Sequence, residues 1–356
     1  MKNNLSKEVI ATIPSEVQMK LEQIKTFLIQ GKASVMVGAG FSKNAQMMEY
    51  VAMKEWNELS DSIFNQLFVK KEDKEQYNYI RQDALKVSQM YECSFGRNAL
   101  DTLIENSLPD EAIAPGKLHK QLMSLHWRDV FTTNYDTLLE RASLDADRPY
   151  QIVTNKETLL YKTSPRIIKL HGSFPNIRPY IITEEDFRTY PQNYPEFVNT
   201  VRQALMESVF CLFGFSGNDP NFLQWLGWLR DVMGNQASPV YLITYEPNLH
   251  KAQTDLFKRR GIEIINIATI QKGISYSEGL EIILTFLGDK NEKKWSPNIG
   301  NANFSKSEDI VKATEQMRKI RKAYPNYLYL PRTILYEFDN SYPFYHWLDK
   351  SLLDLI

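Results

Sequence analysis

A short apolar segment that ends abruptly in a glycine turn constrains the fold of this chain more than any other feature. Ser34–Val37 is rich in apolar and β-branched residues, and Gly38-Ala39-Gly40 follows it directly. A continuous apolar run of this length predicts a buried parallel strand. The glycines leave room for a phosphate, and the amides from Ala39 to Ser42 are expected to point into that space. The segment therefore predicts an α/β sheet with a nucleotide at the end of its first strand.

The same turn also has a purely structural explanation. A Gly-x-Gly turn can serve only to pack a helix against a strand, and the segment alone does not decide between the two. The dinucleotide fingerprint G-x-G-x-x-G would need a glycine at position 43, which is Lys43, and the sequence contains no G-x-x-x-x-G-K-[ST] phosphate loop. The choice therefore depends on the other motifs.

Composition excludes several classes of protein. The 356 residues include 42 basic and 43 acidic side chains, so we expect no general attraction to nucleic acid or to an anionic membrane. Two cysteines are too few for a disulfide framework or a four-cysteine zinc site, and the five histidines lack metal-ligand spacing. The N-terminal residues lack a signal-peptide core, and no apolar run approaches the roughly 18 residues of a membrane span. We expect a cytoplasmic globular protein without a bound metal.

Strands and helices alternate along the rest of the chain. A strand that begins at Arg128 is expected to stop at Asn134, and further strands are expected at Arg166–Leu170, Ser208–Phe213, Val240–Thr244 and Ile262–Ile267. Ser15 is expected to cap a first helix, and Asp219 and Pro220 to begin a later one. The crossover-length spacing predicts an α/β fold with a doubly wound, mostly parallel sheet.

Four of these strand ends carry polar or glycine-rich turns. In doubly wound sheets, ligands bind beyond the carboxyl ends of the strands. We therefore expect the four turns to meet at one crevice, and they are Gly38–Ser42, Thr133–Asp136, His171–Ser173 and Gly214–Asp219.

Two regions fall outside this alternation. Residues 46–126 are mostly helical in pattern and are expected to form an insertion over the mouth of the sheet, with helices at Glu55–Val69, Gln76–Tyr91, Ala99–Leu108 and Lys117–Trp127. The composition shifts at Asp289, so we predict a main domain at 1–288 and an extension at 289–356. This extension is expected to contain a linker, a charged helix at Ser307–Tyr324 and an aromatic-rich tail.

Four motifs, taken in order, resemble the SIR2 (sirtuin-like) family, in particular its prokaryotic branch that serves in anti-phage defence. They read GAGFSKNA, TTNYD, KLHGS and GFSGND, and the resemblance covers residues 20–290. The family implies a Rossmann-like sheet with a smaller helical module, and NAD as the ligand. It also implies an NAD-cleaving enzyme that depletes NAD during phage infection.

The resemblance assigns roles to individual residues. It implies that Asn134 and His171 are catalytic, with His171 as the base. It implies that the other matched residues bind NAD: Gly38, Ala39, Gly40, Phe41 and Ser42 at the pyrophosphate and ribose, Thr133 and Asp136 near the nicotinamide ribose, Gly214, Phe215, Ser216 and Asp219 toward the adenosine, and Glu246 at the adenine ribose.

Two departures from the family pattern argue against protein deacylation. Deacylase members carry four zinc-binding cysteines, which this chain cannot supply. They also follow the first motif with proline, aspartate, phenylalanine and arginine, whereas Lys43–Val51 reads KNAQMMEYV. We therefore expect a zinc-independent NAD+ hydrolase that gives nicotinamide and ADP-ribose.

The chemistry of the key residues agrees with that expectation but leaves alternatives open. A histidine that titrates near neutral pH can take a proton from an attacking water, and an asparagine can orient that water or the ribose hydroxyls. However, His171 could instead be a structural imidazole at a strand end, and Asn134 could form an Asx turn that begins the next helix. Asp136 could simply lie in the first turn of that helix, where an acidic residue is favourable.

Two other functions remain open at this point. The chain could be a non-catalytic sensor of NAD or of an ADP-ribose derivative, or it could transfer ADP-ribose to a macromolecule. An NAD-destroying enzyme must be silent until it is needed. We therefore expect homo-oligomerisation, a partner defence protein or a phage-derived trigger to control it through the C-terminal extension.

Overall fold

The centre of the molecule is a seven-stranded sheet in which all neighbouring strands are parallel. The computed structural model describes residues 13–47, 56–108, 110–217 and 219–288. The strand order is β5-β6-β4-β1-β7-β8-β9. The strands are β1 (Ala33–Val37), β4 (Asp129–Thr132), β5 (Gln151–Val153), β6 (Arg166–Lys169), β7 (Val209–Phe213), β8 (Val240–Thr244) and β9 (Ile262–Asn266). The predicted doubly wound α/β fold is confirmed.

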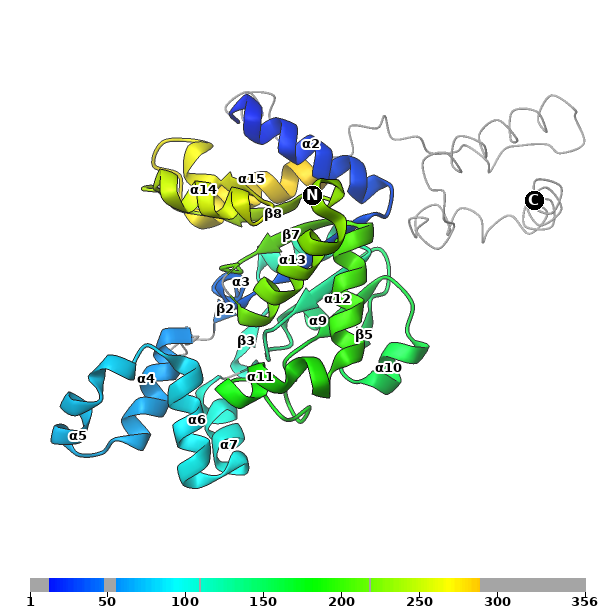
Figure 1. Cartoon of the computed structure of the whole chain (residues 1–356). Coiled ribbons are helices and arrows are strands. Elements are labelled where there is room, and N and C mark those ends of the chain that lie inside the picture. The colour runs from blue at the N-terminus through cyan, green and yellow to red at the C-terminus, as the bar shows by residue number, and fades with distance from the viewer. Residues whose placement is uncertain (1–12, 48–55, 109, 218, 289–356) are drawn as a thin grey trace, which may run out of the picture.

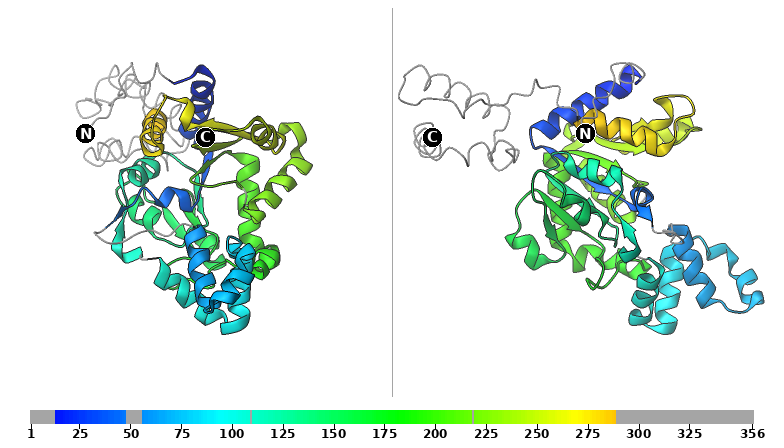
Figure 2. Two further views of the ribbon diagram at one scale, coloured as in Figure 1. Left: turned by 90° about the vertical axis from the view of Figure 1, so that its left-hand side faces the viewer. Right: turned by 180° about the vertical axis from the view of Figure 1, so that it is seen from behind.

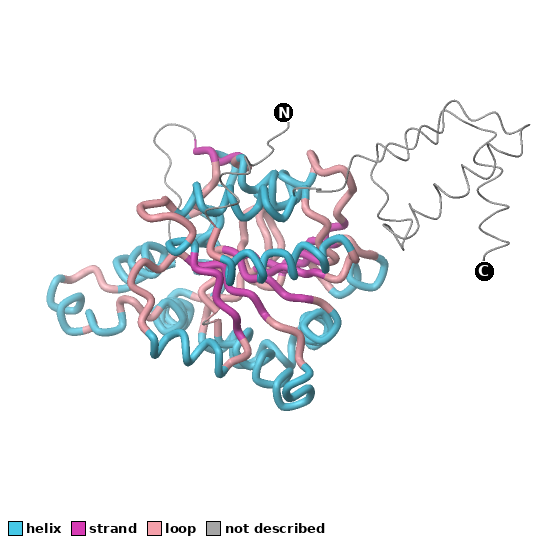
Figure 3. The backbone as a smooth tube through the Cα atoms, turned by 90° about the horizontal axis from the view of Figure 1, so that it is seen from above, coloured by secondary structure: helices cyan, strands magenta, loops and turns pink. Residues whose placement is uncertain are grey.

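Helices cover both faces of this sheet (Figures 1 and 3). One face carries α2 (Ser15–Ile29), α8 (Lys117–Ser124), α9 (Leu138–Ser143) and α15 (Tyr276–Gly288), and the other carries α11 (Glu184–Asn193), α12 (Pro195–Glu207) and α13 (Pro220–Met233). Successive residues of a strand point to opposite faces. Val35 and Val37 accordingly pack in one apolar cluster, and Met36 packs in the other. Burial on both faces explains why the central strands are mostly apolar.

A helical module projects from one end of the sheet (Figures 1 and 2). Its main helices are α4 (Trp56–Leu67), α5 (Lys71–Gln76), α6 (Ala84–Phe95) and α7 (Arg97–Ser107). Of these, α4, α6 and α7 share an apolar cluster with Tyr135, Phe174 and Tyr180, which lie in loops of the sheet domain. The short strands β2 (Gln46–Met47) and β3 (Ile113–Ala114) pair in antiparallel fashion where the module leaves and rejoins the sheet domain. Within the predicted insertion at 46–126, α8 packs over the sheet instead.

The structure corrects several predicted boundaries. Ser15 does not cap the first helix: the helix begins at Ser15 itself, after Pro14, and the cap position makes no side-chain hydrogen bond. The helix expected at Gln76–Tyr91 begins only at Ala84, because Asp83 caps it by accepting a hydrogen bond from the Lys86 amide. The predicted cap at Asp219 is confirmed, since its carboxylate accepts from the Phe222 amide at 2.9 Å. The extension at 289–356 lies outside the described residues.

The remaining helices are short or lie at the edges of the sheet. They are α3 (Ala39–Ser42), α10 (Lys156–Tyr161) and α14 (Lys251–Arg259), with 3-10 turns at Asn78–Ile80, Asp110–Ala112, Gly234–Gln236 and Ile267–Thr269. Within the described ranges, none of the helices combines the length and apolar character that crossing a bilayer requires.

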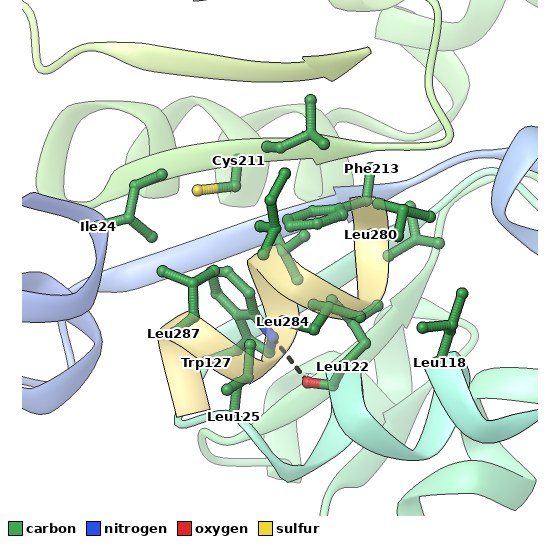
Figure 4. Close-up of a cluster of buried hydrophobic side chains, with 14 of the residues drawn as sticks. Ile24, Leu118, Leu122, Leu125, Trp127, Cys211, Phe213, Leu280, Leu284 and Leu287 are labelled. Carbon is green, nitrogen blue, oxygen red and sulfur yellow. Dashed lines mark hydrogen bonds between the residues drawn. The ribbon is translucent and has the colours of Figure 1, made fainter. Parts of the chain in front are cut away.

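The apolar cluster around Trp127 joins α2 and α15, the first and last helices among the described residues, to the sheet (Figure 4). Trp127 is fully buried, and its indole Nε1 donates a hydrogen bond to the carbonyl oxygen of Leu122 at 3.0 Å. Leu284 of α15 packs in the same cluster with 2% of its surface exposed. The helix that precedes β1 and the last described helix are thus held over one face of the sheet.

We expect Leu284→Ala to lower the free energy of unfolding by about 2–5 kcal/mol, because it removes buried methyl groups and leaves a cavity. Leu160→Ala is the control, since Leu160 is 75% exposed and its change should stay within about 0.5 kcal/mol. Urea denaturation followed by circular dichroism measures both. Equal stability of the two variants would contradict the packing described for α15.

Candidate functional site

The four predicted turns line one cavity at the carboxyl ends of the strands. The cavity has a volume of about 940 Å³, near the upper end of the usual range for small-molecule sites. It spans the ends of β6, β4, β1, β7 and β8. Strands β4, β5 and β6 lie on one side of β1, whereas β7, β8 and β9 lie on its other side. The switch in strand order therefore lies between β1 and β7. Doubly wound sheets bind ligands at such a switch point.

Most of the residues singled out from the sequence lie on this cavity. The lining includes Gly38, Ala39, Gly40, Ser42, Thr133, Asn134, Asp136, His171, Gly214, Phe215, Ser216 and Asp219. Residues up to 181 positions apart in the chain, such as Gly38 and Asp219, therefore share one wall. The expectation that four distant loops converge on one crevice is confirmed.

Phe41 and Glu246 do not line the cavity. Phe41 is fully buried, and its ring packs edge-on against His119 and Phe213 in the core, because the short helix α3 turns its side chain toward the sheet. Glu246 lies beyond the end of β8, where its amide donates to the Asn266 side chain at 3.1 Å. Its neighbour Tyr245 lines the cavity instead. The pocket roles expected for Phe41 and Glu246 therefore have no support in the structure.

The glycines of the first turn allow two loops to touch through their backbones. A Cβ atom at Gly38 would lie 2.6 Å from the Gly214 carbonyl oxygen, and one at Gly40 would lie 2.9 Å from the same atom. Gly214 has φ of +58°, and a Cβ there would lie 2.1 Å from the Phe41 nitrogen. The Gly40 amide donates to the Gly214 carbonyl, and the Phe41 amide donates to the Gly38 carbonyl. The expectation that every amide from Ala39 to Ser42 points into the cavity is therefore wrong.

Ser42 connects two of the predicted residues through its hydroxyl group. The Asn134 Nδ2 donates to Ser42 Oγ at 2.9 Å, and Ser42 Oγ donates to Asp136 Oδ2 at 2.8 Å. The second carboxylate oxygen of Asp136 accepts from the Leu138 amide at 3.2 Å. Because Asn134 and Asp136 are both more than 90% buried, this chain of hydrogen bonds fixes the orientation of the Asn134 amide at the cavity wall.

His171 presents a buried imidazole to the cavity. Only 3% of the residue is exposed, and its ring packs edge-on against Phe187 and Tyr190 at 5.2 and 5.6 Å. Among the described residues, no partner hydrogen-bonds its Nε2 atom. Burial lowers the pKa of His171 below its ordinary value, although Asp219 and Asp186 oppose that shift. The imidazole is therefore neutral at pH 7, and its titration lies on the acid side of the expected neutral range.

Sequence reasoning missed the apolar wall of the cavity. This wall contains Trp56, Leu59, Leu85 and Leu108 from the helical module, Phe174 and Phe187 beside His171, and Tyr245 and Tyr276 near the end of β8. Side chains of this kind also form ordinary helix cores, so their spacing carries no signal of a site. Only the expectation that the insertion covers the mouth of the sheet pointed toward them.

The arrangement combines a neutral base, an oriented amide and an enclosed apolar wall. A neutral imidazole can accept a proton from water, and an amide can hold a hydroxyl group or a water molecule. Among the described residues, no group of three or more His, Cys, Asp or Glu side chains is placed to hold a metal ion. The neutral imidazole and the oriented amide lie on one cavity that is large enough for an organic ligand.

Comparison with known proteins agrees with this geometry. Residues 128–265 match the model of the SIR2-like domain family. The chain is 23% identical over 300 residues to defense-associated sirtuin 2 of Bacillus subtilis, covering 81% of this chain and 28% of that protein. It is 28% identical over 223 residues to the NAD(+) hydrolase ThsA of Enterococcus faecium, covering 60% of this chain and 43% of that protein. The chain thus matches less than half the length of either relative.

A solved structure of a SIR2 homologue in complex with NAD aligns with 75% of this chain and 92% of its own, at 13% identity and a TM-score of 0.35. The match to the SIR2-like domain model at 128–265 includes both Asn134 and His171. Residues 128–265 of this chain thus resemble a SIR2-like domain.

Proposed function

We propose that this protein is an NAD+ glycohydrolase that gives nicotinamide and ADP-ribose and depletes NAD+ in defence against phage. The observation that carries the proposal is the neutral, buried His171 on the same cavity as the oriented amide of Asn134. Relatives named as NAD(+) hydrolases and as a defense-associated sirtuin support the substrate and the setting.

The hydrolysis needs few groups from the protein. The bond between nicotinamide and C1′ of the ribose breaks first, and the electron pair leaves with neutral nicotinamide. An oxocarbenium-like centre forms at C1′, so positioning and dipoles matter more than strong acid catalysis. Water then attacks C1′, and His171 takes its proton while Asn134 holds the water or the ribose hydroxyls. In this scheme Asp136 acts through Ser42, which fixes the Asn134 amide.

We assign the rest of the dinucleotide by the order of the strands. The reacting end lies at β6 and β4, where His171 and Asn134 are found, and the glycine turns after β1 and β7 lie next along the cavity. The pyrophosphate would lie against Gly38–Ser42, and the adenosine would extend past Gly214–Ser216 toward β8. Parallel strands lie about 4.8 Å apart, so the five strand ends span roughly 19 Å, comparable to the length of an extended dinucleotide.

We further propose that the enzyme works without zinc in the cytoplasm and under the control of assembly. The scheme above routes no step through a metal, and the sequence has only two cysteines. A homo-oligomer, a partner defence protein or a phage-derived trigger would control when the enzyme is active, with residues 289–356 as the proposed contact. We also propose that the chain consists of a domain at 1–288, which includes the helical insertion, and the extension at 289–356.

We expect nicotinamide release to fall by about 10²- to 10⁴-fold in His171→Ala, because the variant lacks the base, while NAD+ binding stays nearly unchanged. Asn134→Ala should show a similar loss. The matched control is His250→Ala, since His250 is an exposed histidine that caps α14 away from the cavity. Nicotinamide is measured by chromatography with the purified protein, and NAD+ is measured in phage-infected cells that express each variant.

The two measurements separate the alternatives. Binding without nicotinamide release, together with a constant NAD+ level in infected cells, would identify a sensor and contradict the proposal. Transfer of label from adenine-labelled NAD+ to a protein or nucleic acid would identify an ADP-ribosyltransferase.

The activity should also fall on the acid side of pH 6.5. Burial lowers the pKa of His171 in the folded protein, so the base is fully neutral at pH 7 and becomes protonated only below its ordinary range. The unfolded chain binds this proton first as the pH falls through about 6.5, so stability is also lost in that direction. We expect kcat/KM to be flat from pH 7 to 8.5 and to decline below 6.5. Circular dichroism at each pH checks that the protein is still folded, and a profile that rises toward acid pH would rule out His171 as the base.

A further inference from the structure

A lysine lies buried directly beneath the turn that carries Asn134. Lys169 is the last residue of β6, in register with Thr132 at the end of β4. Its side chain has no exposed surface, and its Nζ atom donates to the main-chain oxygen of Asp136. The same atom pairs with Glu140 Oε1 at 3.0 Å, and the Glu140 side chain is 10% exposed. Two opposite charges are therefore enclosed behind the catalytic turn.

Stability alone does not explain this ion pair. Removing two charges from water is costly, and apolar residues of similar size often replace a buried pair with no loss of stability. The pair is also incompletely satisfied, because no described residue hydrogen-bonds the second carboxylate oxygen of Glu140. A role beyond stability would explain its presence at this place.

The contacts of the Thr133–Asp136 turn indicate that role. The backbone N–H of Asn134 donates to Thr132 Oγ1 at 3.0 Å, and the backbone N–H of Phe174 donates to the Tyr135 carbonyl at 2.9 Å. Lys169 holds the next carbonyl, that of Asp136. Asp136 in turn orients Ser42, and Ser42 orients Asn134. Lys169 is thus the charged side chain at the base of a chain of hydrogen bonds that ends at the cavity.

We propose that Lys169, with Glu140 as its counter-charge, is a positioning residue for the cleavage of the glycosidic bond. The inference rests on the proposed function. Lys169 fixes the backbone of the turn and so the placement of Asn134. Glu140 cancels the charge of the ammonium group, which would otherwise oppose the positive charge that develops at C1′ of the ribose.

Two double variants test this role. Lys169→Met with Glu140→Leu replaces the pair by apolar side chains, so the protein should fold but lose the donor to Asp136. Lys169→Gln with Glu140→Gln keeps an N–H donor in the same place without charge. We expect kcat to fall about 10- to 100-fold in the first variant, with the Kd for NAD+ changed by less than about threefold, because misplacing a group by about 1 Å can cost 10²-fold. The second variant should recover at least half of that loss on a logarithmic scale.

The same pair of strands offers a matched control. Arg166 begins β6 and Asp129 begins β4, so both lie at the other end of these strands from Lys169. The two form an ion pair, with Arg166 Nε 2.7 Å from Asp129 Oδ1. Arg166→Met with Asp129→Leu should keep kcat within about twofold. If this control loses as much activity as the first variant, the effect is general to the sheet and the inference is overturned.

Hydrogen exchange of the amides from Asn134 to Leu138 gives a readout that does not need turnover. Exchange should be at least tenfold faster in Lys169→Met with Glu140→Leu and unchanged in the Arg166 and Asp129 control. Unchanged exchange in Lys169→Met with Glu140→Leu would overturn the inference, and so would a wild-type kcat in that variant. An equal loss of kcat in the methionine and glutamine variants of Lys169 would also overturn it. If the wild-type protein releases no nicotinamide and leaves the NAD+ level of infected cells constant but the exchange changes as expected, the proposed function fails and the positioning of the turn stands. If the apolar variant does not fold, the glutamine variant and its exchange decide the question in the same way.

Discussion

The site depends on the close approach of two backbones at the centre of the sheet. The turn after β1 meets the turn after β7, and the Gly40 amide donates to the Gly214 carbonyl at 3.0 Å. A Cβ at any of the three glycines would come within 3 Å of the facing loop, so larger side chains would separate the two turns. These turns lie on either side of the switch point of the sheet. Their contact therefore sets the floor of the cavity, and the other lining loops are arranged around it.

This contact also changes the meaning of the glycine motif. Read from the sequence, Gly38 and Gly40 had two explanations, space for a phosphate or tight packing. The structure gives them a packing role, since the atoms that a side chain would meet belong to Gly214 and Phe215. Both glycines nevertheless lie on the cavity wall. A turn that is packed tightly on one side and open on the other brings the backbone close to a ligand without any side chain between them.

Sequence patterns identified the sheet well because its central strands are buried on both faces. Runs such as Val209–Phe213 are apolar at every position, and few other local structures produce that pattern. The edge strand β5 was missed because Gln151–Val153 is short and partly exposed, with no apolar run to mark it. Motifs placed backbone turns correctly, but side-chain direction depends on the local turn geometry. Phe41 therefore points into the core, and Tyr245 rather than Glu246 reaches the cavity.

The electrostatic character of the site was beyond the reach of sequence patterns. The motif around His171 gives no sign that the pKa of this histidine is shifted. In the structure Phe187 and Tyr190 pack against its ring, and burial keeps the imidazole uncharged at pH 7. Lys169, two residues earlier, is paired with Glu140. Burial of His171 and the pairing of Lys169 with Glu140 thus both limit the net positive charge at the end of β6. The proposed cleavage passes through a cationic transition state, which surroundings with little positive charge favour more than an added strong acid would. The aromatic packing around His171 and the pairing of Lys169 fit that proposal.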